Sequence, residues 1–310
     1  MDGLKLRTLL LSPVAALVAA AAATAATGTP QVVARIQTGS RPCSEVGGFG
    51  AVWVGNNGSS SLARIDPATN EVTGKVRVGA GPCGVAIGAK SVWVDGYTSA
   101  SVLRVDPRRM KVVRRIKLPD RIWDITFGAG SVWATETALG YVVRIDPKTN
   151  RVKRRYLMPG QEGLGNLRYG SGAVWVGEQY GNRVFRIDTR TGHVSFVRVG
   201  SGPRSMAVSL TAVWVSNSHD NTVSRIDPAT RKVVATIPVG EQPDNGAIAA
   251  DGTVFVPNVA AGTVSRIDPA TNTVIDTIAV GAQPFPAAFA FGDIWVPSAG
   301  GRDVYRIHIG

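Results

Sequence analysis

Polar side chains recur at one position of a segment that repeats about every forty residues. In chain order, the seven residues at that position are Ser44, Gly84, Asp124, Asn166, Ser205, Asn245 and Pro286. Five of the seven are polar, where a strand that only packs against its neighbours would carry apolar side chains. Hydroxyl, amide and carboxylate oxygens gathered in this way can bind a polar ligand or a hard cation.

Further residues able to bind a ligand lie close to these positions. Glu45, Trp123, Arg204 and Asp244 are their direct neighbours in the sequence, and Trp123 offers a face for stacking. Two more carboxylates follow the next predicted strand in successive repeats. We therefore expect a ligand-binding face that contains Ser44, Glu45, Trp123, Asp124, Glu136, Asn166, Glu178, Arg204, Ser205, Asp244 and Asn245. The alternative is a water-filled channel lined by solvated side chains.

No motif assigns a catalytic residue or a metal ligand. The chain lacks the spacing of a Ca²⁺-binding loop, of a Cys/His zinc site and of a phosphate-binding glycine-rich loop. The one cofactor that the oxygen-rich face leaves open is a divalent cation, Mg²⁺ or Ca²⁺.

The elements that must position these residues follow a strict repeat. Arg-Ile-Asp-Pro, or a close variant, begins at Arg64, Arg104, Arg144, Arg186, Arg225, Arg266 and Arg306. A tryptophan or phenylalanine precedes each of these arginines by eleven residues. We expect the Asp-Pro pair to form a β-turn, the arginine stem to cover the next unit while its head pairs locally, and the aromatic ring to fill the space between units.

Each repeat contains four short runs of strand type, separated by glycine, proline and polar residues. Four antiparallel strands per unit, repeated in tandem, predict an all-β fold, a seven-bladed β-propeller with four-stranded blades. We expect one domain over residues 31–310. The last repeat supplies only three strands, so residues 31–39 are predicted to close the last blade and remove two unpaired sheet edges. A solenoid of stacked sheets is the alternative.

The only two cysteines, Cys43 and Cys83, occupy equivalent positions in adjacent repeats. Inner strands of a propeller converge near the axis, where a Cα separation of roughly 4.4–6.8 Å would allow a disulfide. We expect a disulfide, with two free buried thiols as the alternative.

The formal net charge of +12 is unevenly distributed. Two predicted outermost strands and the turn before the first of them hold a cluster that we call the basic flank: Arg108, Arg109, Lys111, Arg114, Arg115, Lys117, Arg151, Lys153, Arg154 and Arg155. One interpretation is docking on an anionic cell-envelope polymer or on lipid headgroups. The other is that the charges block edge-to-edge strand pairing. Nucleic acid is not an expected partner, because no aromatic and basic stacking platform is present.

The N-terminus has the features of a signal peptide. Lys5 and Arg7 precede an apolar run over residues 9–23, and Ala23-Thr24-Ala25 fits the small-x-small cleavage rule. We expect a signal peptide over residues 1–25 and a secreted or periplasmic, monomeric protein with no membrane span after cleavage. An uncleaved anchor is the alternative, since a membrane helix needs roughly 20 apolar residues.

The repeats resemble those of the YVTN-repeat β-propeller family. The resemblance covers residues 31–310 and is carried by the segments 213–217 and 223–240. It implies an exported bacterial protein that binds or scaffolds more readily than it catalyses.

A second resemblance is to the streptogramin B (virginiamycin B) lyase group, which is also seven-bladed. It implies a Mg²⁺-dependent lyase that linearises a cyclic depsipeptide, using a histidine after proline in the turn entering an innermost strand. Here those prolines are followed by Cys43, Cys83, Arg204, Asp244 and Phe285. Glu136 and Glu178 do occupy the place of the group's glutamate, just after the second strand.

A positioned general acid or base typically raises the reaction rate 10²–10⁴-fold, and a site without such a titrating group lacks that rate enhancement. We therefore expect a protein that binds an unidentified polar ligand or protein partner through its axial face. A Mg²⁺-dependent lyase or hydrolase with an axial active site is the alternative.

Overall fold

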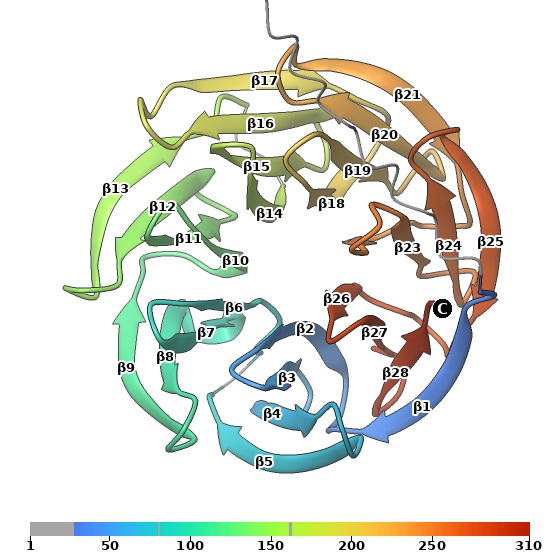
Figure 1. Ribbon diagram of the computed structural model, residues 1–310. Helices are drawn as coiled ribbons and strands as arrows, with labels where there is room; N and C mark the ends of the chain where they lie inside the picture. The colour runs from blue at the N-terminus through green and yellow to red at the C-terminus, as the bar shows by residue number, and fades with distance from the viewer. Residues whose placement is uncertain (1–27, 80, 161–162) are drawn as a thin grey trace, which may run out of the picture.

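The computed structural model describes residues 28–79, 81–160 and 163–310. These residues form seven four-stranded antiparallel sheets arranged as blades around a central axis (Figure 1). The predicted seven-bladed propeller is confirmed, and the closed ring excludes the solenoid. The predicted signal peptide of residues 1–25 lies outside the described residues. Within the described residues, no helix has the length and apolar character needed to cross a bilayer.

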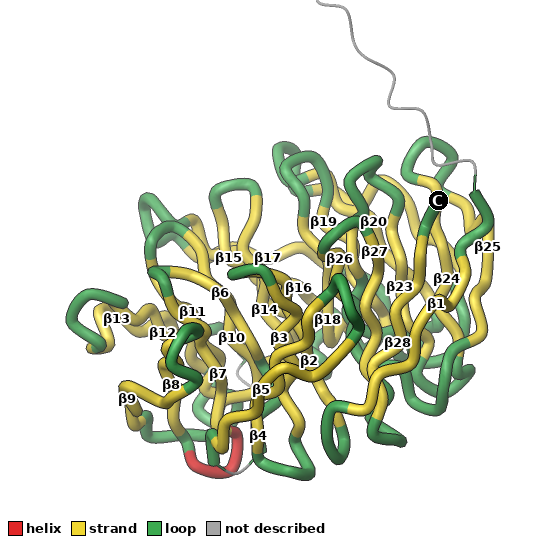
Figure 2. Tube along the Cα trace, turned by 60° about the horizontal axis from the view of Figure 1, so that its bottom comes forward, coloured by secondary structure: helices red, strands yellow, loops and turns green. Residues whose placement is uncertain are grey.

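The strands occupy four concentric positions, and the turns and loops gather at the two ends of the ring (Figure 2). The innermost strands are β2 (Pro42–Gly48), β6 (Val85–Gly88), β10 (Ile122–Gly128), β14 (Leu164–Gly170), β18 (Pro203–Val208), β22 (Ala247–Ile248) and β26 (Ala288–Ala290). The second strands are β3 (Ala51–Asn56), β7 (Ser91–Gly96), β11 (Ser131–Glu136), β15 (Ala173–Glu178), β19 (Val213–Asn217), β23 (Val254–Asn258) and β27 (Asp293–Pro297).

The third strands are β4 (Ser61–Asp66), β8 (Ser101–Asp106), β12 (Tyr141–Asp146), β16 (Arg183–Asp188), β20 (Thr222–Asp227), β24 (Thr263–Asp268) and β28 (Asp303–His308). The outermost strands are β5 (Glu71–Arg77), β9 (Lys111–Lys117), β13 (Arg151–Leu157), β17 (Val194–Arg198), β21 (Lys232–Pro238), β25 (Thr273–Ala279) and β1 (Gln31–Gln37). One short 3-10 helix, η1 (Tyr97–Ser99), follows β7. Blades 1 to 6 each contain four consecutive strands starting at β2, and blade 7 contains β26, β27, β28 and β1.

The first strand closes the ring as predicted. β1 pairs antiparallel with β28, from Gln31 opposite His308 to Gln37 opposite Asp303. The seventh sheet therefore has the order β1-β28-β27-β26. This pairing covers the outer edge of β28, which would otherwise present unpaired backbone groups.

The repeated aromatic residue fills the space between blades, as expected. Trp93 of blade 2 is fully buried and packs in one cluster with Ile122 and Ile125 of blade 3. Its indole Nε1 donates to the Gly88 carbonyl at 3.0 Å, so the polar atom of the ring is also satisfied. Burying a side chain of this size contributes strongly to the cohesion between blades.

The repeated arginine reaches beyond the local pairing that we expected. Arg104 of blade 2 lies 5.1 Å from the Trp93 ring centroid and donates to Pro147 O (2.8 Å) and Asn150 Oδ1 (3.2 Å) of blade 3. Arg306 of blade 7 makes the same pair of contacts with the Asp-Pro turn of blade 1, at Pro67 O and Asn70 Oδ1. Arg225 of blade 5 does so with Pro269 and Asn272 of blade 6. We call this contact the arginine clasp.

The clasp depends on the fifth residue of the turn. Asn70, Asn150 and Asn272 all adopt left-handed backbone conformations, with φ of 61°, 57° and 57°. Asparagine tolerates that region better than most residues and also supplies the acceptor. Blade 5 has Arg231 there, at φ 59°, so the turn that faces Arg186 of blade 4 offers no asparagine acceptor.

We predict that Arg231→Asn stabilises the protein by about 0.5–1.5 kcal/mol, because it relieves the backbone and gives Arg186 an acceptor. Denaturant unfolding measures the effect. Arg231→Ala is the control, since it removes the same charge without adding an acceptor. Equal stability of the two variants would contradict the prediction.

Candidate functional site

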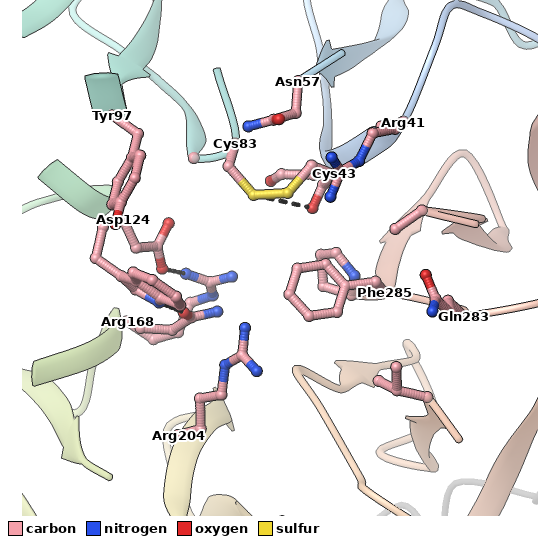
Figure 3. Close-up of a pocket in the computed structure, with 17 residues that line it drawn as sticks. Arg41, Cys43, Asn57, Cys83, Tyr97, Asp124, Arg168, Arg204, Gln283 and Phe285 are labelled. Atoms are coloured by element: carbon pink, nitrogen blue, oxygen red, sulfur yellow. Dashed lines mark hydrogen bonds and ion pairs between the residues drawn. A yellow bond between two sulfur atoms is a disulfide. The ribbon is translucent and has the colours of Figure 1, made fainter. Parts of the chain in front are cut away.

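The starts of the innermost strands enclose an axial pocket of about 390 Å³ (Figure 3). Of the predicted ligand-binding residues, Ser44, Trp123, Asp124, Asn166 and Arg204 line it. The two cysteines also lie in its wall. The structure thus brings together side chains from five blades that are far apart in the sequence.

Gly84 occupies the same ring position in blade 2 for a steric reason. A Cβ atom at Gly84 would lie 2.8 Å from Asp124 Oδ1 and 2.9 Å from Ile125 N of the next blade. The absence of a side chain at Gly84 therefore lets the Asp124 carboxylate turn in against blade 2.

Asp124 is held by a hydrogen-bond network in the pocket wall. Its Oδ1 accepts from Ile125 N (2.8 Å), and its Oδ2 accepts from Leu167 N (3.2 Å) and from Arg168 Nη1 (2.6 Å). Burial raises the pKa of the Asp124 carboxyl, while the Arg168 charge opposes that shift. This network joins blades 3 and 4 and fixes the position of Arg168.

Arg204 stands between two aromatic rings. Its guanidinium carbon lies 5.1 Å from the Trp123 ring centroid and 5.2 Å from that of Phe285, on opposite sides of the axis. The Trp123 indole is itself fixed by donating to Asn166 Oδ1 at 2.8 Å. Asp244 Oδ2 lies 3.8 Å from Arg204 Nε, too far for a hydrogen bond, and that nitrogen has no hydrogen-bond partner among the described residues.

Two arginines that we did not predict also line the pocket. Arg168 lies on β14, two residues after the ring residue Asn166, and Arg41 directly precedes β2. The strand period of two could have found Arg168, because residues two apart point to the same face. Arg41 gave no such signal, since it lies in a turn that varies between repeats.

The other predicted binding residues stand behind or below the pocket. Ser205, Asp244 and Asn245 are buried and are not among the lining residues. Asn245 Oδ1 accepts from Met206 N of blade 5 at 3.0 Å, and Asp244 Oδ1 accepts from Asn245 N at 2.6 Å. The side chains of Asp244 and Asn245 therefore support the pocket wall.

Glu136 and Glu178 do not reach the axial pocket, which corrects their predicted location. The Glu136 carboxylate pairs with Arg155 Nε at 3.2 Å, and Glu178 accepts two hydrogen bonds from Arg183, at 2.6 and 2.8 Å. Both carboxylates are buried at the ends of second strands. At the equivalent position in blade 5, Asn217 binds Thr222 and Ser224 of the third strand. This position links strands within a blade.

Glu45 lines a second cavity, of about 510 Å³, at the other end of the axis. All seven innermost strands contribute to this cavity, and Arg168 lines both cavities. Glu45 is 6% exposed, and neither of its carboxylate oxygens has a hydrogen-bond partner in the described part of the chain. Burial raises the pKa of Glu45 well above its usual range, against a smaller opposing effect of the Arg168 charge.

The predicted disulfide is present. Cys43 and Cys83 are bonded, with their Cα atoms 5.0 Å apart, and they join the innermost parts of blades 1 and 2. Asp95, which is fully buried, accepts a hydrogen bond from Cys83 N at 2.6 Å and holds this segment from the outer side. Burial raises the pKa of the Asp95 carboxyl well above its usual range.

The charge of the axial pocket favours anions. Three arginines, Arg41, Arg168 and Arg204, line it, and among the described residues Asp124 is the only carboxylate in the lining. Within the described part of the chain, no group of three or more His, Cys, Asp or Glu residues is arranged to hold a metal ion.

Comparison with known proteins supports the fold. A family model described as a repeat of unknown function matches residues 87–230, and a YNCE-like β-propeller model matches residues 195–309. No curated protein matches the chain significantly.

Several solved structures share the architecture. Selenomethionine-substituted virginiamycin B lyase from Staphylococcus aureus is 17% identical, with a TM-score of 0.79 over 91% of this chain and 100% of that one. A streptogramin B lyase is 15% identical, with a TM-score of 0.80 over 91% and 98% of the two chains. Hydrazine synthase of Kuenenia stuttgartiensis is 15% identical, with a TM-score of 0.78 over 88% and 97%. Identities this low show the common propeller fold alone.

We predict that replacing both cysteines, Cys43→Ser with Cys83→Ser, lowers the free energy of unfolding by about 4 kcal/mol, as the chain-entropy model gives for a loop of this length. The bond closes a separation of 40 residues. Chemical denaturation with and without reductant measures the loss. Reductant should shift the wild type to the variant's midpoint and leave the variant unchanged. A wild-type midpoint insensitive to complete reduction would contradict the prediction.

A second prediction concerns pH. Because the folded-state pKa of Glu45 is raised above the ordinary value of 4.5, the folded chain binds the proton more tightly than the unfolded chain. Stability from this group is therefore present at low pH and is lost as pH rises above 4.5 through the folded pKa. Glu45→Gln should be more stable than the wild type at pH 7.5 and lose that advantage at pH 4.

Urea unfolding at both pH values tests this prediction. Glu71→Gln, on the exposed outer strand β5, makes the same chemical change away from the second cavity and should show no comparable gain in stability. A Glu45→Gln variant less stable than the wild type at pH 7.5 would mean that the carboxylate is a net stabilising partner of Arg168.

Proposed function

We propose that this protein binds a small organic anion in its axial pocket. The observation that carries the proposal is that Arg168 and Arg204 enter the same pocket and point toward its centre, with Arg41 across from them (Figure 3). Guanidinium groups bind carboxylate and phosphate through strong, charge-assisted hydrogen bonds. Like charges are brought together in this way most favourably when an anion lies between them.

The arginines have donors left for a ligand. Both hydrogen bonds of Arg168 come from Nη1, to Asp124 and to the Leu167 carbonyl, so its Nη2 and Nε make none with the residues that the structure describes. Arg204 is held in place by aromatic rings rather than by a hydrogen-bonded carboxylate. These groups are positioned before binding, which lowers the entropy cost of recognition.

The size and lining of the pocket favour an organic molecule over an inorganic ion. A cavity of about 390 Å³ lies within the usual range for small-molecule sites. Tyr97, Val259 and Phe285 add aromatic and apolar surface around the arginines. The ligand class is therefore an anion joined to a ring or short hydrocarbon. Mg²⁺ or Ca²⁺, which the sequence left open, would face the positive charge of the arginines.

Catalysis has less support than binding. The described residues that line the pocket include no histidine, and their single carboxylate, Asp124, is already engaged by Arg168 and two backbone N–H groups. The likeness to virginiamycin B lyase is one of fold, and Glu136 and Glu178 lie outside the pocket. Lyase or hydrolase activity therefore remains the secondary candidate.

Export to an oxidising compartment is part of the same proposal. Disulfides persist mainly in secreted and periplasmic proteins, and the Cys43–Cys83 bond supports that location. The pocket would then meet ligands from outside the cytoplasm.

Three isosteric probes test the charge of the ligand. Benzoate should raise the thermal unfolding temperature through preferential binding to the folded state, whereas neutral benzamide and cationic benzamidinium should not. Arg204→Gln should weaken benzoate binding about tenfold or more, since it removes a charged hydrogen-bond donor. Arg77→Gln, on the outer strand β5, is the matched control and should bind as the wild type does. Preferential binding of benzamidinium, or no effect of benzoate, would contradict the proposal.

A further inference from the structure

The outer rim of blades 2 and 3 is far more basic than the rest of the rim. The two outermost strands, β9 and β13, each carry four basic and no acidic residues. They are neighbours on the ring (Figure 1). The outermost strand of blade 6, β25, carries no basic residue and one acidic residue, and each of the other four has at most two basic residues.

Part of this basic flank serves the fold. Arg155 pairs with Glu136, and Arg115 donates to Ser101 Oγ (3.1 Å) and to the Val78 carbonyl (3.4 Å). Arg109 lies 3.6 Å from Asp106. The free part of the flank, which we call the open basic rim, consists of exposed residues that have no carboxylate of the described residues within ion-pair distance: Arg108, Lys111, Arg114, Lys117, Arg151, Lys153 and Arg154.

Two residues of the open basic rim lie where they cost stability. Arg114 is directly opposite Arg104 in the strand register, and Arg154 is directly opposite Arg144. Like charges directly opposite each other on neighbouring strands are destabilising. Arg104 is the clasp arginine of blade 2, and Arg144 of blade 3 donates to Ser131 Oγ and to the Thr189 carbonyl of blade 4, so each is already committed to another role.

The other five blades avoid this conflict. Opposite the repeated arginine they have a small residue, a hydroxyl or an acid: Gly74, Ser195, Ala235, Asp276 and Ala34. Edge protection alone does not require arginine at this register position, since the outermost strands of the other five blades have no arginine there. A local feature that lowers stability in two adjacent blades points to a use outside the fold.

We propose that the open basic rim binds a linear polyanion. The charges follow the convex outer wall across two blades, which a flexible chain can follow from one strand to the next. A flat lipid surface would touch the convex wall over a smaller part of its length.

A nucleic acid is the less favoured polyanion here. The aromatic ring within these two strands, Tyr156, is 5% exposed and lies under Arg154, with 4.7 Å between the guanidinium carbon and the ring centroid. It is therefore not available for the base stacking on which single-strand binding depends.

The test uses Arg114→Asp with Arg154→Asp, and long-chain inorganic polyphosphate as the probe. The substitutions copy the arginine–aspartate pairing of blade 6, where Arg266 is opposite Asp276. We expect the double variant to unfold at a higher temperature than the wild type and to bind polyphosphate about tenfold or more weakly. The slope of log affinity against log salt should fall by roughly two, because two ionic contacts are lost.

The control makes the same change in net charge elsewhere on the rim. Lys75→Asp with Arg77→Asp alters β5 of blade 1, where both residues are exposed, and should leave polyphosphate binding within about twofold of the wild type. An equal loss in this control would show that net charge alone drives binding and would overturn the proposal.

Two other results would also overturn it. One is tighter binding to phosphatidylglycerol vesicles or to a single-stranded oligonucleotide than to polyphosphate at the same salt concentration. The other is unchanged polyphosphate binding by the Arg114→Asp, Arg154→Asp variant, which would leave edge protection as the role of these charges.

Discussion

The propeller depends on how each blade holds the next, and the arginine clasp makes this contact most directly. In three blades, a guanidinium lies across the blade's own tryptophan and donates to the carbonyl and asparagine of the following turn. Removing a charge from water is costly unless its hydrogen bonds are replaced, and the turn replaces them. The same contact from Arg306 to Pro67 joins residues 239 positions apart and so reinforces ring closure.

Ring closure creates the axial pocket. Seven innermost strands converge, so short polar side chains at their starts meet residues from neighbouring blades rather than solvent. Asp124 turns in against Gly84 on one side and holds Arg168 on the other. The disulfide between Cys43 and Cys83 ties β2 to the segment that leads into β6. The rigid pocket wall positions Arg168 and Arg204 without help from a ligand.

Arginine serves three purposes in this molecule, and its surroundings decide which. Arg104 and Arg306 join blades, Arg168 and Arg204 give the axial pocket its charge, and Arg114 and Arg154 stand on the outer rim. Arg114 and Arg115 are adjacent in the sequence, yet Arg115 donates to Ser101 while Arg114 makes no such contact. Alternation along a strand sends neighbouring side chains to opposite faces of the sheet, so Arg115 lies on the face that carries Ser101 and Arg114 on the face that carries Arg104.

The sequence alone determined the parts of the structure that the repeat encodes. The spacing of arginine and tryptophan predicted seven blades. The missing fourth strand of the last repeat, with residues 31–39 to supply it, predicted ring closure, and the equivalent positions of the cysteines predicted the disulfide. Only the tertiary structure decided which charges meet. Glu136 and Glu178 looked like axial ligands until Arg155 and Arg183 were seen to hold them, and the arginines of the pocket made its charge positive. Repeat periodicity specifies where a strand lies, but a long charged side chain selects its partner from whatever the folded neighbours bring within its reach.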